Sequence, residues 1–239
     1  MRRAVAFLTL FGRAATPTGT TMSWFPIVGA LIGLCVGGAW WLAARVWAPL
    51  IAGAAVVAAD LVLTGLLHFD GLADAGDGLI APLTRERRLA AMADPSIGAF
   101  GVLTVGAVLL LRFSAFASMR PTPLVIGGLW CASRTAMVAI TELLDYARPE
   151  GLVRSFLGTR SALQRALVRG SVVGGLALAA GLVMIGKGAR GLIALGAELV
   201  AITLVALFSR RRLGGYTGDV LGAVAVIGET IGLLALAGR

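Results

Sequence analysis

Seven apolar stretches, each about long enough to cross a lipid bilayer, limit the folds that this chain can adopt. Hydrophobic residues make up 58% of the sequence and charged residues only 14%, a balance that excludes a water-soluble domain. Backbone groups inside hydrocarbon must be hydrogen-bonded within the structure itself, and apolar runs of this length are typical of helices. We therefore expect an all-α, polytopic integral membrane bundle in a single domain over residues 1–239. The seven expected segments lie near 26–44, 47–67, 100–118, 122–141, 171–186, 190–208 and 219–237.

Basic residues predict the orientation of these segments. With the N-terminus in the cytoplasm, fourteen of the 21 Lys and Arg residues fall on the cytoplasmic side and five on the opposite side, while Arg112 and Arg134 lie within apolar segments. Positive residues are retained on the cytoplasmic side of membranes, so the sequence predicts an N-in topology. This topology places the connections 68–101, 142–170 and 209–218 together at one cytoplasmic mouth.

A strip of small residues marks the first segment. Gly29, Gly33 and Gly37 recur at four-residue spacing, which makes a smooth helix face that another helix can approach closely. We expect this strip to pack within the chain, and a seam of a homo-oligomer is the alternative.

The segment 68–78 concentrates three carboxylates and the only histidine of the chain, His68, at the end of an apolar stretch. Asp70, Asp74 and Asp77 follow an i, i+4, i+7 spacing, which on an α-helix places them within about 60° of one face. Converging carboxylates repel one another, and a hard, oxygen-rich cluster suits Mg²⁺ shared with substrate phosphates. We therefore expect a Mg²⁺ site; the plainer alternative is an acidic helix start followed by a glycine turn.

Two further connections carry polar clusters that would meet the aspartates at the same mouth. One holds Arg148 and Glu150 among several arginines, and the other holds Thr217 and Asp219 just before the last apolar segment. Carboxylates that bind metal, together with guanidinium groups that bind phosphate, are what phosphoryl or nucleotidyl transfer requires. The alternatives are lipid contact for the arginines and helix N-capping for Thr217 or Asp219.

Five short motifs occur in order along nearly the whole chain. They are Trp24-Phe-Pro-Ile-Val-Gly29, His68-x-Asp70-Gly-Leu-Ala-Asp74-x-x-Asp77-Gly, Asp94-Pro-Ser-Ile-Gly98-x-x-Gly101, Ala147-Arg-Pro-Glu150-Gly151, and Thr217-Gly-Asp219-x-Leu-Gly222-Ala with Glu229. Together they resemble the cobalamin synthase family, the adenosylcobinamide-GDP ribazoletransferases. The resemblance implies an enzyme of the bacterial cytoplasmic (inner) membrane whose active site faces the cytoplasm.

This resemblance also implies the reaction and its participants. Adenosylcobinamide phosphate would pass from adenosylcobinamide-GDP to α-ribazole or its 5′-phosphate, with GMP released and adenosylcobalamin or its 5′-phosphate formed. The expected cofactor is Mg²⁺ and the expected surroundings are membrane lipid, whereas no nucleic acid partner is expected. The residues implied are Asp70, Asp74 and Asp77 for the metal, His68 with these aspartates for catalysis, and Asp94, Arg148, Glu150, Thr217 and Asp219 for substrate.

Two details of the resemblance leave alternatives open. The ribazole hydroxyl must lose a proton, and either His68, an imidazole that titrates near neutrality, or a carboxylate can accept it. The family pattern has a basic residue two positions after Asp94, where this chain has Ser96. A neighbouring arginine such as Arg85, Arg87 or Arg88 would then have to contact phosphate.

Two acids inside apolar segments, Asp60 and Glu198, raise another class of function. An unpaired charge in hydrocarbon is costly, so each is expected to find a partner inside the bundle, and Arg134 is one candidate. Intramembrane acids are also typical of a small ion-coupled transporter. Here, however, the ionisable residues crowd one mouth instead of forming a chain across the membrane. A different membrane-embedded, nucleotide-activated phosphotransferase is the nearer alternative.

Overall fold

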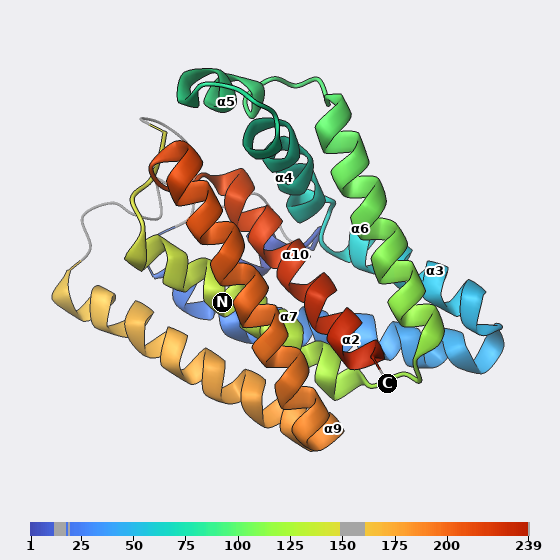
Figure 1. Cartoon of the computed structure of the whole chain (residues 1–239). Coiled ribbons are helices and arrows are strands. Elements are labelled where there is room, and N and C mark those ends of the chain that lie inside the picture. Colours follow the sequence, from blue (N-terminus) through green and yellow to red (C-terminus); the bar gives the residue numbers. More distant parts are fainter. Residues whose placement is uncertain (12–17, 19, 149–160, 239) are drawn as a thin grey trace.

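The computed structural model describes residues 1–11, 18, 20–148 and 161–238, and their regular structure is helical apart from one bridge between Tyr146 and Tyr216 (Figure 1). The longer helices are α2 (Phe25–Val46), α3 (Pro49–Leu63), α6 (Ala99–Ser118), α7 (Pro123–Leu143), α9 (Ala162–Leu213) and α10 (Gly218–Ala237). The shorter ones are α1 (Arg2–Leu8), the 3₁₀-helix η1 (Thr21–Trp24), α4 (Leu67–Ala75), the π-helix η2 (Gly76–Ile80) and α5 (Arg85–Ala91). The prediction of an all-α membrane bundle is confirmed.

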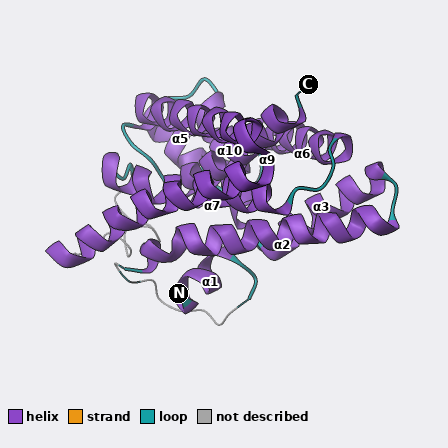
Figure 2. Ribbon diagram, turned by 90° about the horizontal axis from the view of Figure 1, so that it is seen from below, coloured by secondary structure: helices purple, strands orange, loops and turns teal. Residues whose placement is uncertain are grey.

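Helix α7 forms the centre of the bundle, with α2 on one side and α9 and α10 on the other (Figure 2). Every residue in the α7 stretch 125–138 is buried. On the α2 side the two helices approach closely, because a Cβ at Gly29 or Gly33 would collide with the backbone carbonyls of Trp130 and Ile126. The glycine strip therefore packs within the chain, as the sequence predicted.

The described residues form a multi-pass membrane protein. Five helical stretches are long and apolar enough to span a bilayer, and the bent pair formed by α3 with α4 and η2 would add a sixth. One of the five, α9, is itself two helices that meet at Gly188, whose φ of 56° and ψ of −136° are not helical. The figure of seven spans and the N-in orientation stay predictions.

Helix α9 is a hairpin. The chain turns back at Gly188, and the turn is so tight that a Cβ at Gly191 would collide with the carbonyl group of Val183. The predicted segments 171–186 and 190–208 are the two arms of this hairpin. Both ends of α9 consequently lie at the same end of the bundle (Figure 1).

A sharp bend separates α3 from α4. Gly65 and Leu66 have φ values of 59° and 62°, and the axes of the two helical pieces differ by 93°. A left-handed backbone cannot continue a right-handed helix, so the helix in the predicted segment 47–67 stops short of the predicted end. The chain instead forms a 15-residue helix that ends at Leu63, and the aspartate motif begins a helix of its own.

A network of buried charges joins the helices in the interior. Arg112 on α6 is 1% exposed, and its Nη1 lies 2.6 Å from Asp60 Oδ2 on α3 while its Nη2 lies 2.5 Å from Glu229 Oε2 on α10. Arg134 on α7 pairs with the same Glu229, and Asp60 also accepts a hydrogen bond of 3.1 Å from Trp130 Nε1. Because charges in hydrocarbon are stable only when paired, this network fixes four helices relative to one another.

Of the two intramembrane acids, Asp60 has a partner inside the bundle as expected, whereas Glu198 has no hydrogen-bond partner among the described residues. Asp60 pairs with Arg112, while Arg134 pairs with Glu229. Glu198 is fully buried, and neither of its carboxylate oxygens has a hydrogen-bond partner among the described residues. Glu198 packs against α10 near Gly228. Glycine has no side chain, so this contact gives the Glu198 carboxylate no partner.

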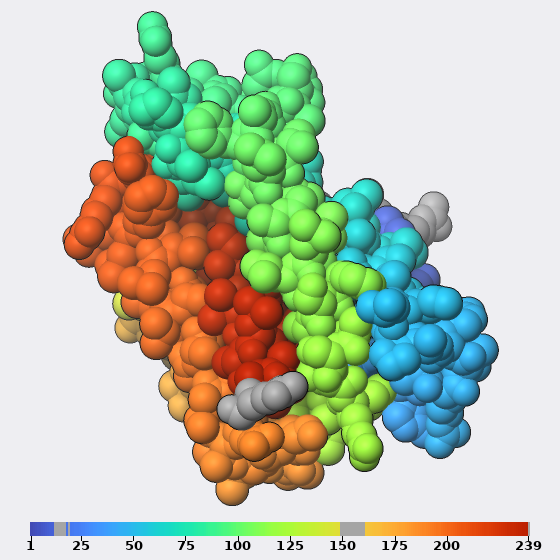
Figure 3. Space-filling view, turned by 45° about the vertical axis from the view of Figure 1, so that its right-hand side comes forward, coloured from blue at the N-terminus to red at the C-terminus, as the bar shows by residue number. Residues whose placement is uncertain are grey.

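Helix α10 lies between α9 and α6 (Figure 3). Its N-terminus contacts α4, and its middle carries Glu229 into the charge network. The network therefore also positions the end of α10 that faces the aspartate motif.

Replacing Arg112 by Met should destabilise the fold strongly, because Asp60 and Glu229 would remain buried with fewer partners. Removing one member of a buried ion pair costs about 3–5 kcal/mol. Arg120→Met removes an exposed arginine just beyond α6 and should cost less than about 1 kcal/mol. Denaturant titrations of the protein in detergent micelles, followed by circular dichroism, measure both. Equal stability of the two variants would contradict the role given to the network.

Candidate active site

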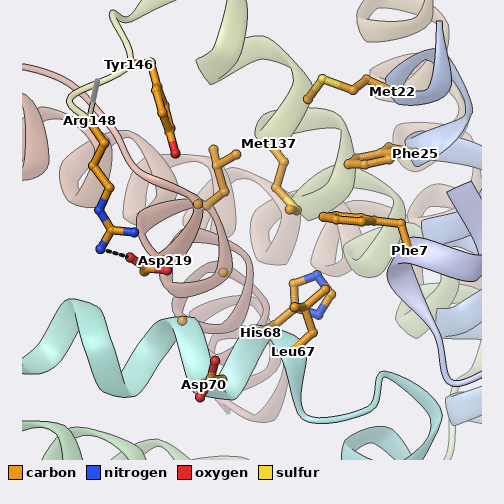
Figure 4. Close-up of a pocket in the computed structure, with 14 residues that line it drawn as sticks. Phe7, Met22, Phe25, Leu67, His68, Asp70, Met137, Tyr146, Arg148 and Asp219 are labelled. Atoms are coloured by element: carbon orange, nitrogen blue, oxygen red, sulfur yellow. Dashed lines mark ion pairs between the residues drawn. The ribbon is translucent and has the colours of Figure 1, made fainter. Parts of the chain in front are cut away.

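A cavity of about 230 Å³ lies where α4, α7 and α10 approach α1 and the start of α2. Its apolar lining consists of Phe7, Met22, Phe25, Leu67, Met137 and Leu221, and its polar lining of His68, Asp70, Tyr146, Arg148 and Asp219. Figure 4 shows the aromatic and methionine side chains to one side and the ion pair of Arg148 with Asp219 to the other. We call these two parts the apolar end and the polar end of the cavity.

Helix α4 carries Asp70 and Asp74 close to the N-terminus of α10. Asp70 is exposed and lines the cavity, whereas Asp74, one turn later, is half-buried and does not line it. The carboxylates of Asp219, Asp70 and Asp77 repel that of Asp74, and the guanidinium group of Arg148 attracts it. Four acids from α4, η2 and α10 thus act on one another at this end of the bundle.

The third aspartate of the motif, Asp77, is engaged elsewhere. Its Oδ2 accepts a hydrogen bond of 2.7 Å from the backbone N–H of Gly98, and its Oδ1 accepts one of 2.9 Å from that of Gly101. These amides belong to the N-terminus of α6, where a carboxylate satisfies unpaired donors and the helix dipole. Helix α4 ends at Ala75 and the chain continues as a π-helix, so Asp77 does not belong to the same α-helix as Asp70 and Asp74.

Asp219 and Arg148 form the polar end. Asp219 Oδ2 lies 2.8 Å from Arg148 Nη2, which also donates a hydrogen bond of 3.0 Å to the carbonyl oxygen of Met92. Thr217 is fully buried and is the N-cap of α10, since its Oγ1 accepts a hydrogen bond of 3.3 Å from the N–H of Val220. Of the two residues that the sequence left open, Thr217 therefore caps the helix and Asp219 lines the cavity.

The connection that carries Arg148 is fastened to the segment before α10. Ala147 N donates to the carbonyl oxygen of Tyr216 at 2.8 Å, and Tyr216 N donates to that of Asp145 at 2.9 Å. Arg85 on α5 donates from Nη2 to the carbonyl oxygen of Ala147 at 3.3 Å. Arg85 therefore holds this connection instead of standing free for a phosphate.

Two glycines allow α4 and α10 to touch. A Cβ at Gly71 would lie 2.9 Å from the carbonyl oxygen of Asp219, and a Cβ at Gly222 would lie 3.0 Å from that of His68. Either side chain would push the helices apart, because packed interiors have no room for an added methyl group. The crossing is what brings Asp219 beside the aspartates of α4.

His68 points to the apolar end, toward Phe7 and Met137 (Figure 4). It is 2% exposed, and neither ring nitrogen has a hydrogen-bond partner in the described part of the chain. The charges that act on it are the guanidinium groups of Arg134 and Arg112. Apolar walls and positive neighbours are poor surroundings for a group that must take up a proton, so this placement favours a carboxylate as the proton acceptor.

Asp94 does not line the cavity. Its Oδ1 accepts a hydrogen bond of 2.8 Å from the backbone N–H of Ser96, and this bond holds the pKa of the exposed Asp94 carboxyl below its ordinary value. Arg88 is buried and donates to the carbonyl oxygen of Gly78 at 2.7 Å, so it supports the π-helix. Glu150 lies outside the described residues.

The apolar end is the part of the site that the sequence did not reveal. Phe7, Met22, Phe25 and Met137 come from four different elements, and each reads in sequence as an ordinary residue of a membrane protein. The one available signal was the position of Phe25 inside a motif that begins at Trp24.

The donor chemistry of the polar end fits Mg²⁺. Within the described ranges, no three His, Cys, Asp or Glu side chains are arranged to surround a metal ion by themselves. Mg²⁺ needs only one or two protein carboxylates, because it takes its other ligands from water and substrate phosphates. Asp70 and Asp74, with Asp219 nearby, offer hard oxygen donors whose combined negative charge exceeds the positive charge of Arg148.

Asp77→Ala should loosen the start of α6, because it removes both acceptors from the amides of Gly98 and Gly101. Loss of a helix cap costs about 1 kcal/mol, so amide exchange at Gly101 should accelerate about fivefold. Hydrogen exchange read by mass spectrometry measures this rate. Asp94→Ala, which removes only the bond to Ser96, serves as the matched control and should leave Gly101 unchanged. Unaltered exchange at Gly101 in the Asp77 variant would contradict the capping role.

Comparison with known proteins identifies relatives along nearly the whole chain. The family model of cobalamin-5-phosphate synthase matches residues 1–237. The adenosylcobinamide-GDP ribazoletransferase of Chlorobium phaeobacteroides (strain BS1) is 32% identical over 234 residues, which cover 96% of this chain and 92% of that protein. Proteins of the same name from Ralstonia nicotianae and Citrobacter koseri are each 37% identical, over 89% of this chain and over 82% and 85% of their own lengths.

No solved structure gives a significant match to the chain. The sequence relatives, in contrast, cover it almost from end to end, and the family model includes every residue that lines the cavity. The chain therefore belongs to the cobalamin-5-phosphate synthase family.

Proposed function

We propose that the protein transfers the adenosylcobinamide phosphate group of adenosylcobinamide-GDP to α-ribazole or its 5′-phosphate, the reaction that the names of its relatives imply. A ribose hydroxyl oxygen of ribazole, one that stays free when the 5′-oxygen carries a phosphate, attacks the phosphorus next to cobinamide, the bond from this phosphorus to the GMP oxygen breaks, and GMP leaves. The observation that carries the proposal is the cavity itself, because it joins an apolar end to a polar end that holds Asp70, Arg148 and Asp219.

The side chains of the polar end supply positioning and charge. A guanidinium group suits phosphate oxygens, and Arg148 can exchange its contact with Asp219 for a phosphate. Holding the attacking oxygen and the phosphorus in line lowers the barrier of a transfer that needs little covalent help from the protein. The hydroxyl proton passes to a carboxylate, and both Asp70 and Asp219 line the cavity.

Mg²⁺ belongs to the proposal as well. Asp70 and Asp74 would hold the ion, and Asp77 would support them through its bonds to α6. When bound, the ion supplies neutralisation of phosphate charge. The excess of carboxylates around Asp74 supports this assignment.

The cytoplasmic membrane and a cytoplasmic opening of the cavity are further parts of the proposal. The end of the bundle that holds the cavity also holds Arg85, Arg148 and the arginines at 210–212 that end α9. Basic residues gather on the cytoplasmic side of membrane proteins, which supports this orientation.

The buried charges give no support to an ion-coupled transporter. Asp60, Arg112, Glu229 and Arg134 are paired with one another. Glu198 has no hydrogen-bond partner among the described residues, but it is 0% exposed, whereas coupling sites use acids that an ion or proton can reach. We therefore retain the transfer reaction alone.

Asp70→Asn and Asp74→Asn keep the shape of each side chain and remove its charge, and each should lower turnover about 100-fold or more. The assay follows GMP release from adenosylcobinamide-GDP by detergent-purified protein supplied with α-ribazole and MgCl₂. Chelation with EDTA should stop turnover, and added Mg²⁺ should restore it. Glu86→Gln changes an exposed acid outside the cavity and should keep the wild-type rate.

Each outcome of this experiment bears on a separate part of the proposal. Normal turnover in both Asn variants would refute the role of the acid cluster. Full turnover in EDTA would refute the role of Mg²⁺. No GMP release by the wild-type protein would refute the reaction.

Gly71→Ala should lower turnover about tenfold and destabilise the protein by about 1–3 kcal/mol, because the added methyl group pushes against the backbone of Asp219 and misplaces the polar end. Gly38→Ala is the matched control, since a Cβ at Gly38 meets only open space. It should leave turnover unchanged. The rate of GMP release and the thermal unfolding temperature are measured for both variants. Equal rates of GMP release would show that the close crossing of α4 and α10 has no effect on the transfer reaction.

A further inference from the structure

The apolar end of the cavity has the shape and chemistry of a site for a flat ring system. Phe7 and Phe25 stack there with ring centroids 5.9 Å apart and planes 16° from parallel. Met22 and Met137 complete the wall, and methionine packs well against aromatic rings because its side chain is flexible and polarisable. A ligand that fills this end must present apolar surface, and a flat aromatic ring suits these neighbours well.

One buried polar group interrupts the apolar wall. His68 is 2% exposed, points into the cavity, and has no hydrogen-bond partner for either ring nitrogen within the described residues (Figure 4). Buried polar atoms are almost always hydrogen-bonded, and an orphaned one is costly. A neutral imidazole has one N–H donor and one acceptor, so a ligand with a single acceptor atom in its ring would satisfy the donor.

We propose that the apolar end binds the aromatic base of ribazole and that the neutral imidazole of His68 donates a hydrogen bond to it. This inference rests on the proposed function. The base is a dimethylbenzimidazole: two flat fused rings, two methyl groups on one edge, and one unsubstituted ring nitrogen that can only accept. The rings and methyl groups match the wall of Phe7, Phe25, Met22 and Met137, and the nitrogen matches the donor.

The dimensions of the cavity agree with this ligand. At about 230 Å³ the cavity is below the range of roughly 300–1,000 Å³ typical of pockets for drug-sized molecules, so it can enclose a base and part of its ribose but not a corrinoid. A base seated beside His68 extends its ribose toward Asp70 and Asp219, where the attacking ribose hydroxyl is needed. His68 is then a specificity-determining residue for the acceptor substrate.

A change in the ligand tests the hydrogen bond without any change in the protein. The probe is the ribazole analogue in which C–H replaces the unsubstituted ring nitrogen, a dimethylindole riboside of the same shape. Equilibrium competition against α-ribazole, on detergent-purified wild-type protein without Mg²⁺ and without the cobinamide nucleotide, should show about tenfold weaker binding of the analogue. Equal binding of the two ribosides would overturn the proposal.

Variants of His68 then identify the donor. His68→Leu should bind both ribosides equally, whereas His68→Asn keeps an N–H donor and should recover part of the discrimination. In turnover, His68→Leu should raise KM for α-ribazole several-fold and leave KM for adenosylcobinamide-GDP unchanged. Thr135→Val removes a buried hydroxyl outside this cavity and is the control that should discriminate as the wild type does. Discrimination that survives His68→Leu would overturn the assignment to His68.

The failure of this inference is distinct from the failure of the proposed function. Wild-type protein that releases GMP but binds both ribosides equally would refute the base site and leave the reaction intact. Wild-type protein that binds α-ribazole in preference to the analogue but releases no GMP would support the base site and refute the reaction.

Discussion

Three helices meet on one guanidinium group, that of Arg112. It pairs with Asp60 on α3 and with Glu229 on α10, and it also donates from Nη2 to the carbonyl oxygen of Val226 at 3.0 Å. The ring of Phe69 on α4 lies 5.2 Å from the same guanidinium carbon. Because a charge inside a membrane protein must keep its partners, the helices around Arg112 have little freedom to slide. The contact between Phe69 and Arg112 therefore holds α4, which carries Asp70 and Asp74, from the side that faces the interior of the bundle.

The site depends on two close contacts of different kinds. Gly71 and Gly222 let α4 and α10 cross at backbone distance, and this crossing unites acids from separate parts of the sequence. At the same place α1 and the start of α2 supply Phe7 and Phe25, which form an apolar wall beside the charges. One cavity thus offers an apolar surface for rings and a polar surface for phosphate. A substrate that has both parts can therefore bind in only one orientation.

The sequence predicted the helices better than the contacts between them. Long apolar runs can only be helices in hydrocarbon, and the topology they imply brings Arg148 and Asp219 to one end of the bundle. The spacing of the aspartates was interpreted on an unbroken α-helix. It therefore did not predict the π-helix that contains Asp77 or the hydrogen bond from Gly101 to Asp77. Arg112 and Arg134 are equivalent candidates in sequence, and only the packing of α6 against α3 selects Arg112 for Asp60.

The bend after α3 has a consequence for the surrounding lipid. At 15 residues, α3 is about 22 Å long, whereas the hydrocarbon core of a bilayer is about 30 Å thick. Such a hydrophobic mismatch is relieved when the bilayer thins beside the short helix, at a cost of fractions of a kcal/mol per Å. Thinning draws headgroups and water toward α4, the helix that begins where α3 stops and bears the exposed Asp70. We therefore expect acyl chain length in the surrounding membrane to affect how well the polar end of the cavity is hydrated.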